Sequence, residues 1–160
     1  MKKYFLRMLF GFLVMAGVVS ASFSAYAQEE MKAVFGMYLY GKGWDEGGTD
    51  NAYRRAPADS YVTAIKASLR NQPQGMTGTI AYQVNLSGSG WLDWQENYGQ
   101  AGAVDTNKPL EAVRMKLTGQ LTENFDLYYS VFQNGSWTDL VMNGETAGQE
   151  GCGLRVDGIR

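Results

Sequence analysis

The sequence contains no histidine and only one cysteine, Cys152, in 160 residues. Without histidine the chain cannot build a Ser-His-Asp or Cys-His nucleophilic site, or a histidine-ligated zinc site. A lone cysteine also excludes a disulfide within the chain. These two absences remove most routes to hydrolytic chemistry. We therefore expect a protein that is not an enzyme and that uses no cofactor and no metal.

Long hydrophobic runs are also scarce, because only residues 8–19 form one. Three basic residues precede this run, and small residues follow it, ending in Ala25-Tyr26-Ala27. This order is typical of a secretory signal peptide over residues 1–27, cleaved before Gln28. A membrane anchor is the alternative, but the run is shorter than the about 20 residues that span a bilayer. We expect export, no membrane insertion after cleavage, and a secreted or cell-surface location.

Positive charge is in short supply after the signal peptide. The chain has 14 Lys and Arg and 16 Asp and Glu, and three of the basic residues lie in residues 1–27. The 11 basic and 16 acidic residues that remain give a net charge of −5. Nucleic acids select clusters of Lys and Arg, so we expect no nucleic-acid partner. The remaining segment, 28–160, has the length of one domain with a single core.

One pattern occurs three times along the chain. An aromatic residue recurs every 47 residues, a tryptophan follows after eight or nine positions, and an acidic residue follows two positions later. The three sets are Phe35, Trp44 and Glu46; Tyr82, Trp91 and Asp93; and Tyr129, Trp137 and Asp139. A fixed period of this length indicates stacked copies of one supersecondary unit. We place the three units at residues 33–69, 78–117 and 127–160.

Within each unit, apolar and polar residues alternate, which is the period of a strand rather than a helix. Residues 80–86 show this best, and Asn134-Gly135 between two apolar runs is a strong hairpin signal. We predict an all-β domain whose three units share one core around a pseudo-threefold axis, with a β-trefoil favoured over a β-prism. The third unit stops at Arg160, in mid-strand by this register. A short last strand and a truncated chain are both compatible with that.

The second and third units resemble the clostridial hydrophobic-with-tryptophan (ChW) repeat family. The second unit matches its pattern at Tyr82, Gly90-Trp91, Asn97, Ala101-Gly102 and Glu111-Ala112-Val113. The third unit matches it at Tyr129, Trp137, Asn143-Gly144, Ala147-Gly148 and Asp157-Gly158-Ile159. The first unit departs further, because its middle loop is longer and lacks the Ala-Gly pair. The resemblance implies a secreted or cell-surface protein of a Gram-positive bacterium that serves extracellular interaction such as adhesion, with no known catalysis.

The repeated tryptophans are candidate ligand contacts, because an indole face stacks on a sugar ring while a nearby carboxylate binds hydroxyl groups. On a strand, each tryptophan and the acid two positions on point to the same face. Core packing is the favoured alternative for all three rings. The candidate contact set is Trp44, Trp91, Trp137, Glu46, Asp93 and Asp139, with Asn97 and Asn143 as further polar contacts.

Trp94 is a separate candidate. Its counterparts in the other units are Gly47 and Leu140, so the architecture does not demand an aromatic residue there. By strand alternation it lies on the opposite face from Trp91, and Tyr98 is close by. We predict that Trp94 and Tyr98 form an exposed contact surface.

These features predict a secreted or cell-surface binding module without catalytic activity. Its expected partner is an extracellular carbohydrate or another cell-surface component. A protein-interaction or structural surface module is the alternative, in which the aromatic rings fill the core and the loops meet a cell-surface protein.

Overall fold

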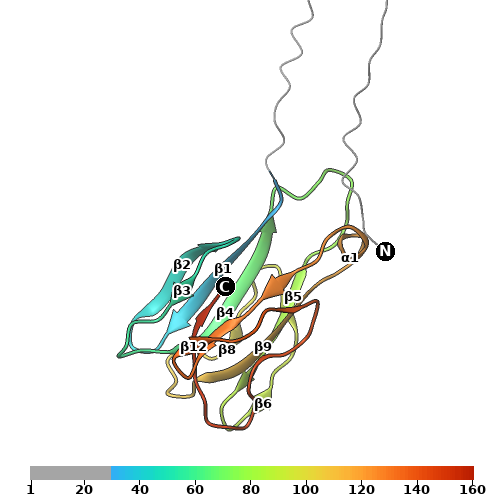
Figure 1. Cartoon of the computed structure of the whole chain (residues 1–160). Helices are drawn as coiled ribbons and strands as arrows, with labels where there is room; N and C mark the ends of the chain where they lie inside the picture. The colour runs from blue at the N-terminus through green and yellow to red at the C-terminus, as the bar shows by residue number, and fades with distance from the viewer. Residues whose placement is uncertain (1–29) are drawn as a thin grey trace, which may run out of the picture.

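A computed structural model describes residues 30–160, and within them the chain is almost entirely β (Figure 1). The one helix in this range, α1 (Leu121–Asn124), has four residues. None of the helices in the described part is long and apolar enough to cross a membrane. The all-β prediction is confirmed, and the expected signal peptide at residues 1–27 lies outside the described residues.

The strands form three larger antiparallel sheets and one isolated pair. The first sheet has the order β2-β1-β4-β8, built from β1 (Lys32–Leu39), β2 (Gly43–Thr49), β4 (Val62–Arg70) and β8 (Ala101–Gly102). The second has the order β14-β9-β5-β6 with β7 also on β5, built from β5 (Ile80–Leu86), β6 (Gly90–Trp91), β7 (Gln95–Glu96), β9 (Leu110–Leu117) and β14 (Ala147–Gly148).

The third sheet has the order β12-β11-β15-β3, built from β3 (Arg54–Arg55), β11 (Val131–Gln133), β12 (Ser136–Trp137) and β15 (Val156–Ile159). The isolated pair is β10 (Tyr128–Tyr129) with β13 (Val141–Met142). Figure 1 shows the long strands β1 and β4 side by side, and β9 and β5 belong to a separate sheet.

The same register occurs in each of the three sheets. Four residues that pair in a row across each sheet are here called a rung. The rungs are Trp44, Tyr38, Ala64 and Gly102; Trp91, Asn85, Ala112 and Gly148; and Trp137, Phe132, Gly158 and Arg55. In each sheet the register shifts directly after the second residue of the rung, which is Tyr38, Asn85 or Phe132.

The short outer strands connect the sheets in a cycle. The strand β8 follows the second hairpin but joins the first sheet, β14 follows the third hairpin but joins the second, and β3 follows the first hairpin but joins the third. Close backbone contact at these joins requires glycine. Gly148 has a φ of 100°, and a Cβ added there would lie 2.5 Å from the carbonyl oxygen of Glu111.

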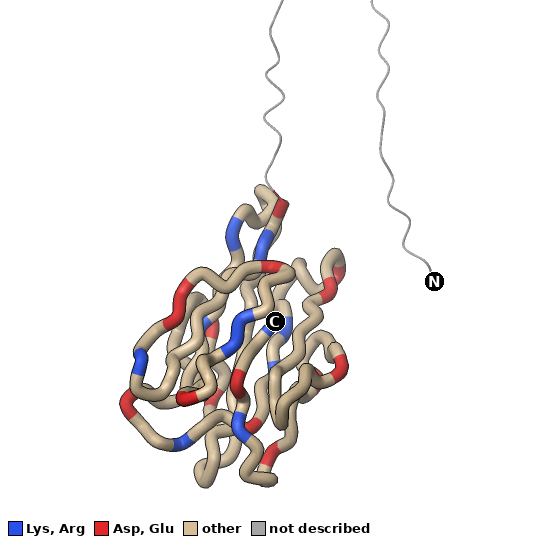
Figure 2. Tube along the Cα trace, turned by 60° about the vertical axis from the view of Figure 1, so that its left-hand side comes forward, with Lys and Arg blue, Asp and Glu red and all other residues tan. Residues whose placement is uncertain are grey.

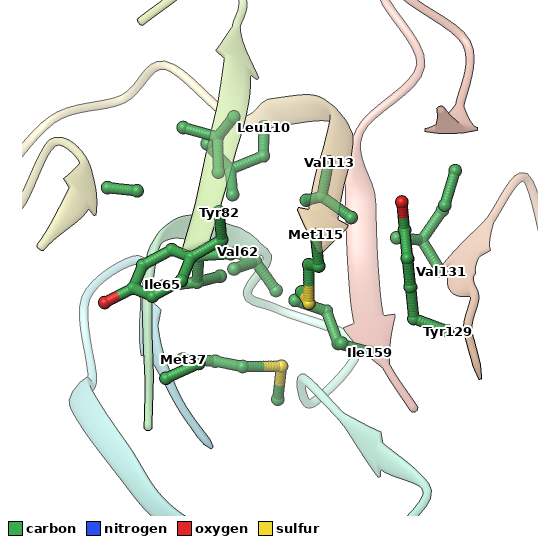
Figure 3. Close-up of a cluster of buried hydrophobic side chains, with 14 of the residues drawn as sticks. Met37, Val62, Ile65, Tyr82, Leu110, Val113, Met115, Tyr129, Val131 and Ile159 are labelled. Atoms are coloured by element: carbon green, nitrogen blue, oxygen red, sulfur yellow. The ribbon is translucent and has the colours of Figure 1, made fainter. Parts of the chain in front are cut away.

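The inward faces of the sheets form one core (Figure 3). Tyr82 and Tyr129 are among its largest fully buried side chains, and Phe35 packs against it from a partly buried position. The hydroxyl groups of Tyr82 and Tyr129 donate hydrogen bonds to the carbonyl oxygens of Gly99 and Glu145. These bonds satisfy the polar ends of the two buried rings, which lets an aromatic residue with a hydroxyl group occupy the core.

Candidate functional site

The tryptophans of the three rungs lie outside the core. Trp44, Trp91 and Trp137 are each partly buried, and the buried apolar cluster contains none of them. The middle strands explain this, because Met37 and Leu39 are buried on either side of Tyr38, the residue that pairs with Trp44. The favoured expectation that these rings are core residues was therefore wrong. They pack on the outer faces of the sheets.

A basic residue on or directly after a strand of the same sheet covers each of these rings. Lys66 on β4 and Arg114 on β9 each follow a buried apolar residue, and Arg160 follows Ile159, the last residue of β15, so all three point to the outer face. The pairs and the distances from the cation to the ring centroid are Lys66 on Trp44, 4.1 Å; Arg114 on Trp91, 4.0 Å; and Arg160 on Trp137, 5.2 Å. Sequence reasoning missed these cations, although each stands one position after Ile65, Val113 or Ile159. The contact is attractive because the indole face is electron-rich.

Four side chains form one network: Lys66, Glu46 and Trp44 from the first sheet, and Tyr98 from the turn after β7. The ammonium group of Lys66 lies 2.5 Å from Oε1 of Glu46 and 4.7 Å from the ring centroid of Tyr98, besides its contact with Trp44. The hydroxyl group of Tyr98 donates to Oε2 of Glu46 at 2.6 Å. The backbone N–H of Tyr98 also donates to the carbonyl of Ala67, which holds this loop against β4. The structure thus brings together three of the predicted site residues, Trp44, Glu46 and Tyr98.

This network shifts the pKa values of two of its members. The pKa of the Tyr98 hydroxyl is raised from 10.0 to about 12, first by partial burial and second by the hydrogen bond to Glu46. For Glu46, burial acts to raise the pKa, but the hydrogen bonds from Lys66 and Tyr98 outweigh it, so the pKa lies below 4.5. The arrangement therefore favours an ionised Glu46 and a neutral Tyr98.

Trp94 is the most exposed of the four tryptophans, at 39%. The ammonium group of Lys116 lies over its ring, 4.4 Å from the centroid. Arg114 and Lys116 are two residues apart on β9, so they point to the same face, and so do the two indole rings they contact. The expected opposite placement of Trp91 and Trp94 was wrong. Residues 92–94 form no regular strand, so alternation does not apply to them.

The remaining predicted contacts lie on the surface. Asp93 and Asp139 are exposed, as are Asn97 and Asn143. Both asparagines have a left-handed backbone, and each accepts a hydrogen bond from the residue just before the first strand of its unit: Asn97 from the hydroxyl group of Thr79 at 3.2 Å, and Asn143 from the N–H of Leu127 at 3.0 Å. Turn formation accounts for these two residues, because asparagine tolerates this conformation better than most residues. Figure 2 shows acidic and basic residues interspersed over the body.

A second set of unpredicted residues lies beside the rung tryptophans. Tyr38 packs edge-on against Trp44 with 5.4 Å between ring centroids, and Phe132 packs against Trp137 at the same separation. At the second rung this position holds Asn85, which lies beside a cavity of about 540 Å³. Two carboxylates, Glu111 and Glu150, also line this cavity. Each of these three polar residues comes from a different strand or loop, so no local motif could reveal the cavity.

The chemistry of these surfaces suits ring contacts and hydrogen bonds. The exposed indole of Trp94 has an ammonium group over its ring and offers a flat apolar face. The cavity at Asn85 offers hydrogen-bond acceptors. Within residues 30–160 no group of three or more His, Cys, Asp or Glu side chains is placed to hold a metal ion. The fold and these surfaces define an all-β module of recurring strand units with aromatic residues on the outer faces.

Comparison with protein families gives one match. Residues 85–119 match the family model described as Clostridial hydrophobic W. The matched segment runs from Asn85 through Trp91 and Trp94 to the end of β9, and it includes Arg114 and Lys116. It supports the ChW resemblance for the second unit. No curated protein and no solved structure matches the chain.

Proposed function

We propose that this chain is an exported binding module without catalytic activity, which holds a carbohydrate at a cell surface through exposed aromatic side chains. The proposal rests on the family match of the second unit, on the basic and apolar leader in residues 1–27, and on the lack of histidine. The observation that carries it is the exposed indole of Trp94, with Lys116 fixed over one face.

Trp94 suits sugar binding for two reasons. A solvent-facing indole presents apolar area that a sugar ring can cover at a small cost in side-chain entropy. The ammonium group of Lys116 supplies hydrogen-bond donors beside that area, where sugar hydroxyl groups can accept. The ring is also not required by the fold, because Leu140 occupies the counterpart position in the third unit and is 57% exposed.

We further propose that the whole described domain consists of three ChW repeats around a pseudo-threefold axis. Three features support this proposal: the recurring rungs, the cyclic exchange of β8, β14 and β3, and the cation over each rung tryptophan. The arrangement as three separate sheets of four or five strands favours the β-prism over the β-trefoil. Such an array presents three related outer faces to a partner.

Titration of tryptophan fluorescence with a panel of oligosaccharides identifies a ligand of the wild-type domain, and isothermal titration then compares the affinities of the variants. Trp94→Ala should weaken binding by about fivefold or more, since loss of a stacked ring is worth about 1–3 kcal/mol in comparable aromatic contacts. Leu140→Ala is the matched control, because it removes an exposed apolar side chain at the corresponding position and should leave affinity unchanged. Normal saccharide binding by Trp94→Ala would remove Trp94 as the contact.

A protein partner on the cell surface is the alternative occupant. If none of the oligosaccharides binds to the wild-type domain, the carbohydrate proposal fails. Retention of the domain on protease-sensitive cell-surface material, together with loss of retention in Trp94→Ala, would then assign the same aromatic face to a protein.

A further inference from the structure

The cavity beside Asn85 is lined by a residue whose rung position holds an aromatic ring in the other two sheets. Asn85, Tyr38 and Phe132 hold the same place in their rungs, each paired with the rung tryptophan. Tyr38 and Phe132 pack their rings edge-on against that tryptophan. The short amide of Asn85 cannot fill the same volume. The residues lining the cavity are Asn85, Ser87, Gly88, Gly90, Glu111, Glu150, Gly151 and Gly153.

The polar groups of this cavity are held in place. Glu111 is 3% exposed, and its Oε2 accepts a hydrogen bond from the N–H of Gly151 at 2.6 Å. Glu150 accepts from the indole N–H of Trp91 and lies 3.4 Å from the amide nitrogen of Asn85. Arg114 in turn covers the ring of Trp91. The tryptophan therefore positions Glu150 at the cavity.

The chemistry of the lining restricts the ligand. Two carboxylates and an amide oxygen are hydrogen-bond acceptors, and no Lys or Arg lines the cavity. The lining repels anions and favours a molecule with several hydrogen-bond donors. The volume of about 540 Å³ is within the range of small-molecule sites.

The corresponding positions elsewhere lack this combination. Thr63 and Asp157 are the counterparts of Glu111, since each precedes the third residue of its rung. At the first rung the hydroxyl group of Tyr38 bonds to Asp105 at 2.5 Å, which closes the space with a ring. At the third rung the guanidinium of Arg55 lies 3.6 Å from the ring centroid of Phe132 and covers it. The open acidic cavity is thus specific to the second unit.

We propose that this cavity is a saccharide subsite, selective for sugar units that carry no negative charge, in which Glu111, Glu150 and Asn85 accept hydrogen bonds from ring hydroxyl groups. This inference rests on the proposed carbohydrate function and adds to it a second contact region and a rule of specificity. Neutral oligosaccharides bind, and uronic-acid oligosaccharides of the same length do not.

Two substitutions test the subsite by isothermal titration with a neutral oligosaccharide that binds the wild-type domain. Asn85→Tyr places in the cavity the ring that the first sheet already carries there, and Glu150→Gln removes a charge with little change in shape. Each should weaken binding by about tenfold or more, because a hydrogen bond to a charged group is lost or blocked. Asp105→Asn is the matched control at the first sheet and should bind as the wild type does.

Cys152 provides an independent readout. It is the only cysteine of the chain, it is exposed, and it lies between two glycines that line the cavity. Alkylation of Cys152 by iodoacetamide should become severalfold slower when the neutral oligosaccharide is present in saturating amount. This measurement uses the wild-type protein and does not depend on the folding of any variant.

The outcomes separate the two proposals. If the wild type binds a neutral saccharide, Trp94→Ala weakens it, and both Asn85→Tyr and Glu150→Gln bind normally, the subsite is overturned while the carbohydrate function stands. An unchanged alkylation rate, or equal affinity for uronic-acid oligosaccharides, also contradicts the subsite. If no saccharide binds, both proposals fall together.

Discussion

The guanidinium of Arg114 lies over the indole ring of Trp91, 4.0 Å from its centroid, while the indole N–H donates to Glu150. One half-buried ring therefore connects a strand of the second sheet to a loop that follows the third hairpin. Trp91 therefore has a structural role, and the contacts by which it stabilises the fold lie at the surface. This differs from a core tryptophan, whose contribution comes from complete removal of apolar area from water.

The partial burial of Trp91 sets the expected cost of removing it. We predict that Trp91→Ala lowers the free energy of unfolding by about 2 kcal/mol, below the about 3–5 kcal/mol typical of a fully buried Trp→Ala change. Arg114→Met should cost about 0.5–1 kcal/mol, because it removes the cation but keeps an apolar stem on the ring. Urea denaturation followed by circular dichroism measures both. A decrease of about 4 kcal/mol or more in the unfolding free energy of Trp91→Ala, as for a fully buried ring, would show that Trp91 behaves as a core residue.

Gly148 lies where two backbones meet, and a substitution there tests the exchange of strands between sheets. Its φ is 100°, and a Cβ would lie 2.5 Å from the carbonyl oxygen of Glu111. Gly148→Ala should destabilise the domain by more than about 2 kcal/mol, since backbone strain at positive φ alone costs about 1–2 kcal/mol.

The matched control for this prediction is Gly88→Ala. Gly88 also has a positive φ, 71°, but no atom lies within 4 Å of an added Cβ. Gly88→Ala should lower the free energy of unfolding only by the cost of backbone strain at positive φ, about 1–2 kcal/mol. Equal melting temperatures for the two variants would contradict the close approach of β14 to β9.

The sequence allowed prediction of the strand class and of the positions that recur, but not of how the outer strands connect the sheets. Alternation over residues 80–86 corresponds to the long strand β5, although all seven residues of this strand are buried. The exchanged strands β3, β8 and β14 have two residues each, too few to show any period. They are defined by backbone contacts between segments far apart in the sequence. In the sequence such a contact is marked only by a glycine or a small residue at the point of close approach.

The candidate site divides in the same way. Trp94 was predicted to be exposed because the fold does not require an aromatic residue there, and Tyr98 because it is close by in the sequence; each is 39% exposed. The cavity at Asn85 depends on the absence of a ring, and an asparagine in a strand is not a signal by itself. Only comparison with Tyr38 and Phe132 in the same register reveals it.

The pKa of Glu46 predicts a loss of stability in acid. Its pKa lies below 4.5 in the folded protein, because the hydrogen bonds from Lys66 and Tyr98 outweigh its burial. The ionised group therefore stabilises the fold at pH values above 4.5, and this contribution is lost as the pH falls through the folded pKa. The difference in unfolding free energy between wild type and Glu46→Gln should shrink below that pH. A difference that stays constant with pH would show that Glu46 makes no charge-dependent contribution.

Tyr98 predicts the corresponding behaviour in alkali. Its pKa is raised from 10.0 to about 12, by burial first and then by the hydrogen bond to Glu46. A raised folded pKa stabilises the protein fully below pH 10.0, and the contribution is lost as the pH rises toward about 12. Other tyrosines of the domain also have raised pKa values, so the measurement is the difference in tyrosinate absorbance between wild type and Tyr98→Phe. That difference should develop near pH 12, above the pH at which an exposed tyrosine ionises.

In Glu46→Gln the Tyr98 transition should move to lower pH, because the carboxylate no longer opposes a second negative charge. If the transition of Tyr98 occurs at the pH of a free tyrosine, the hydrogen bond between Tyr98 and Glu46 is absent in solution.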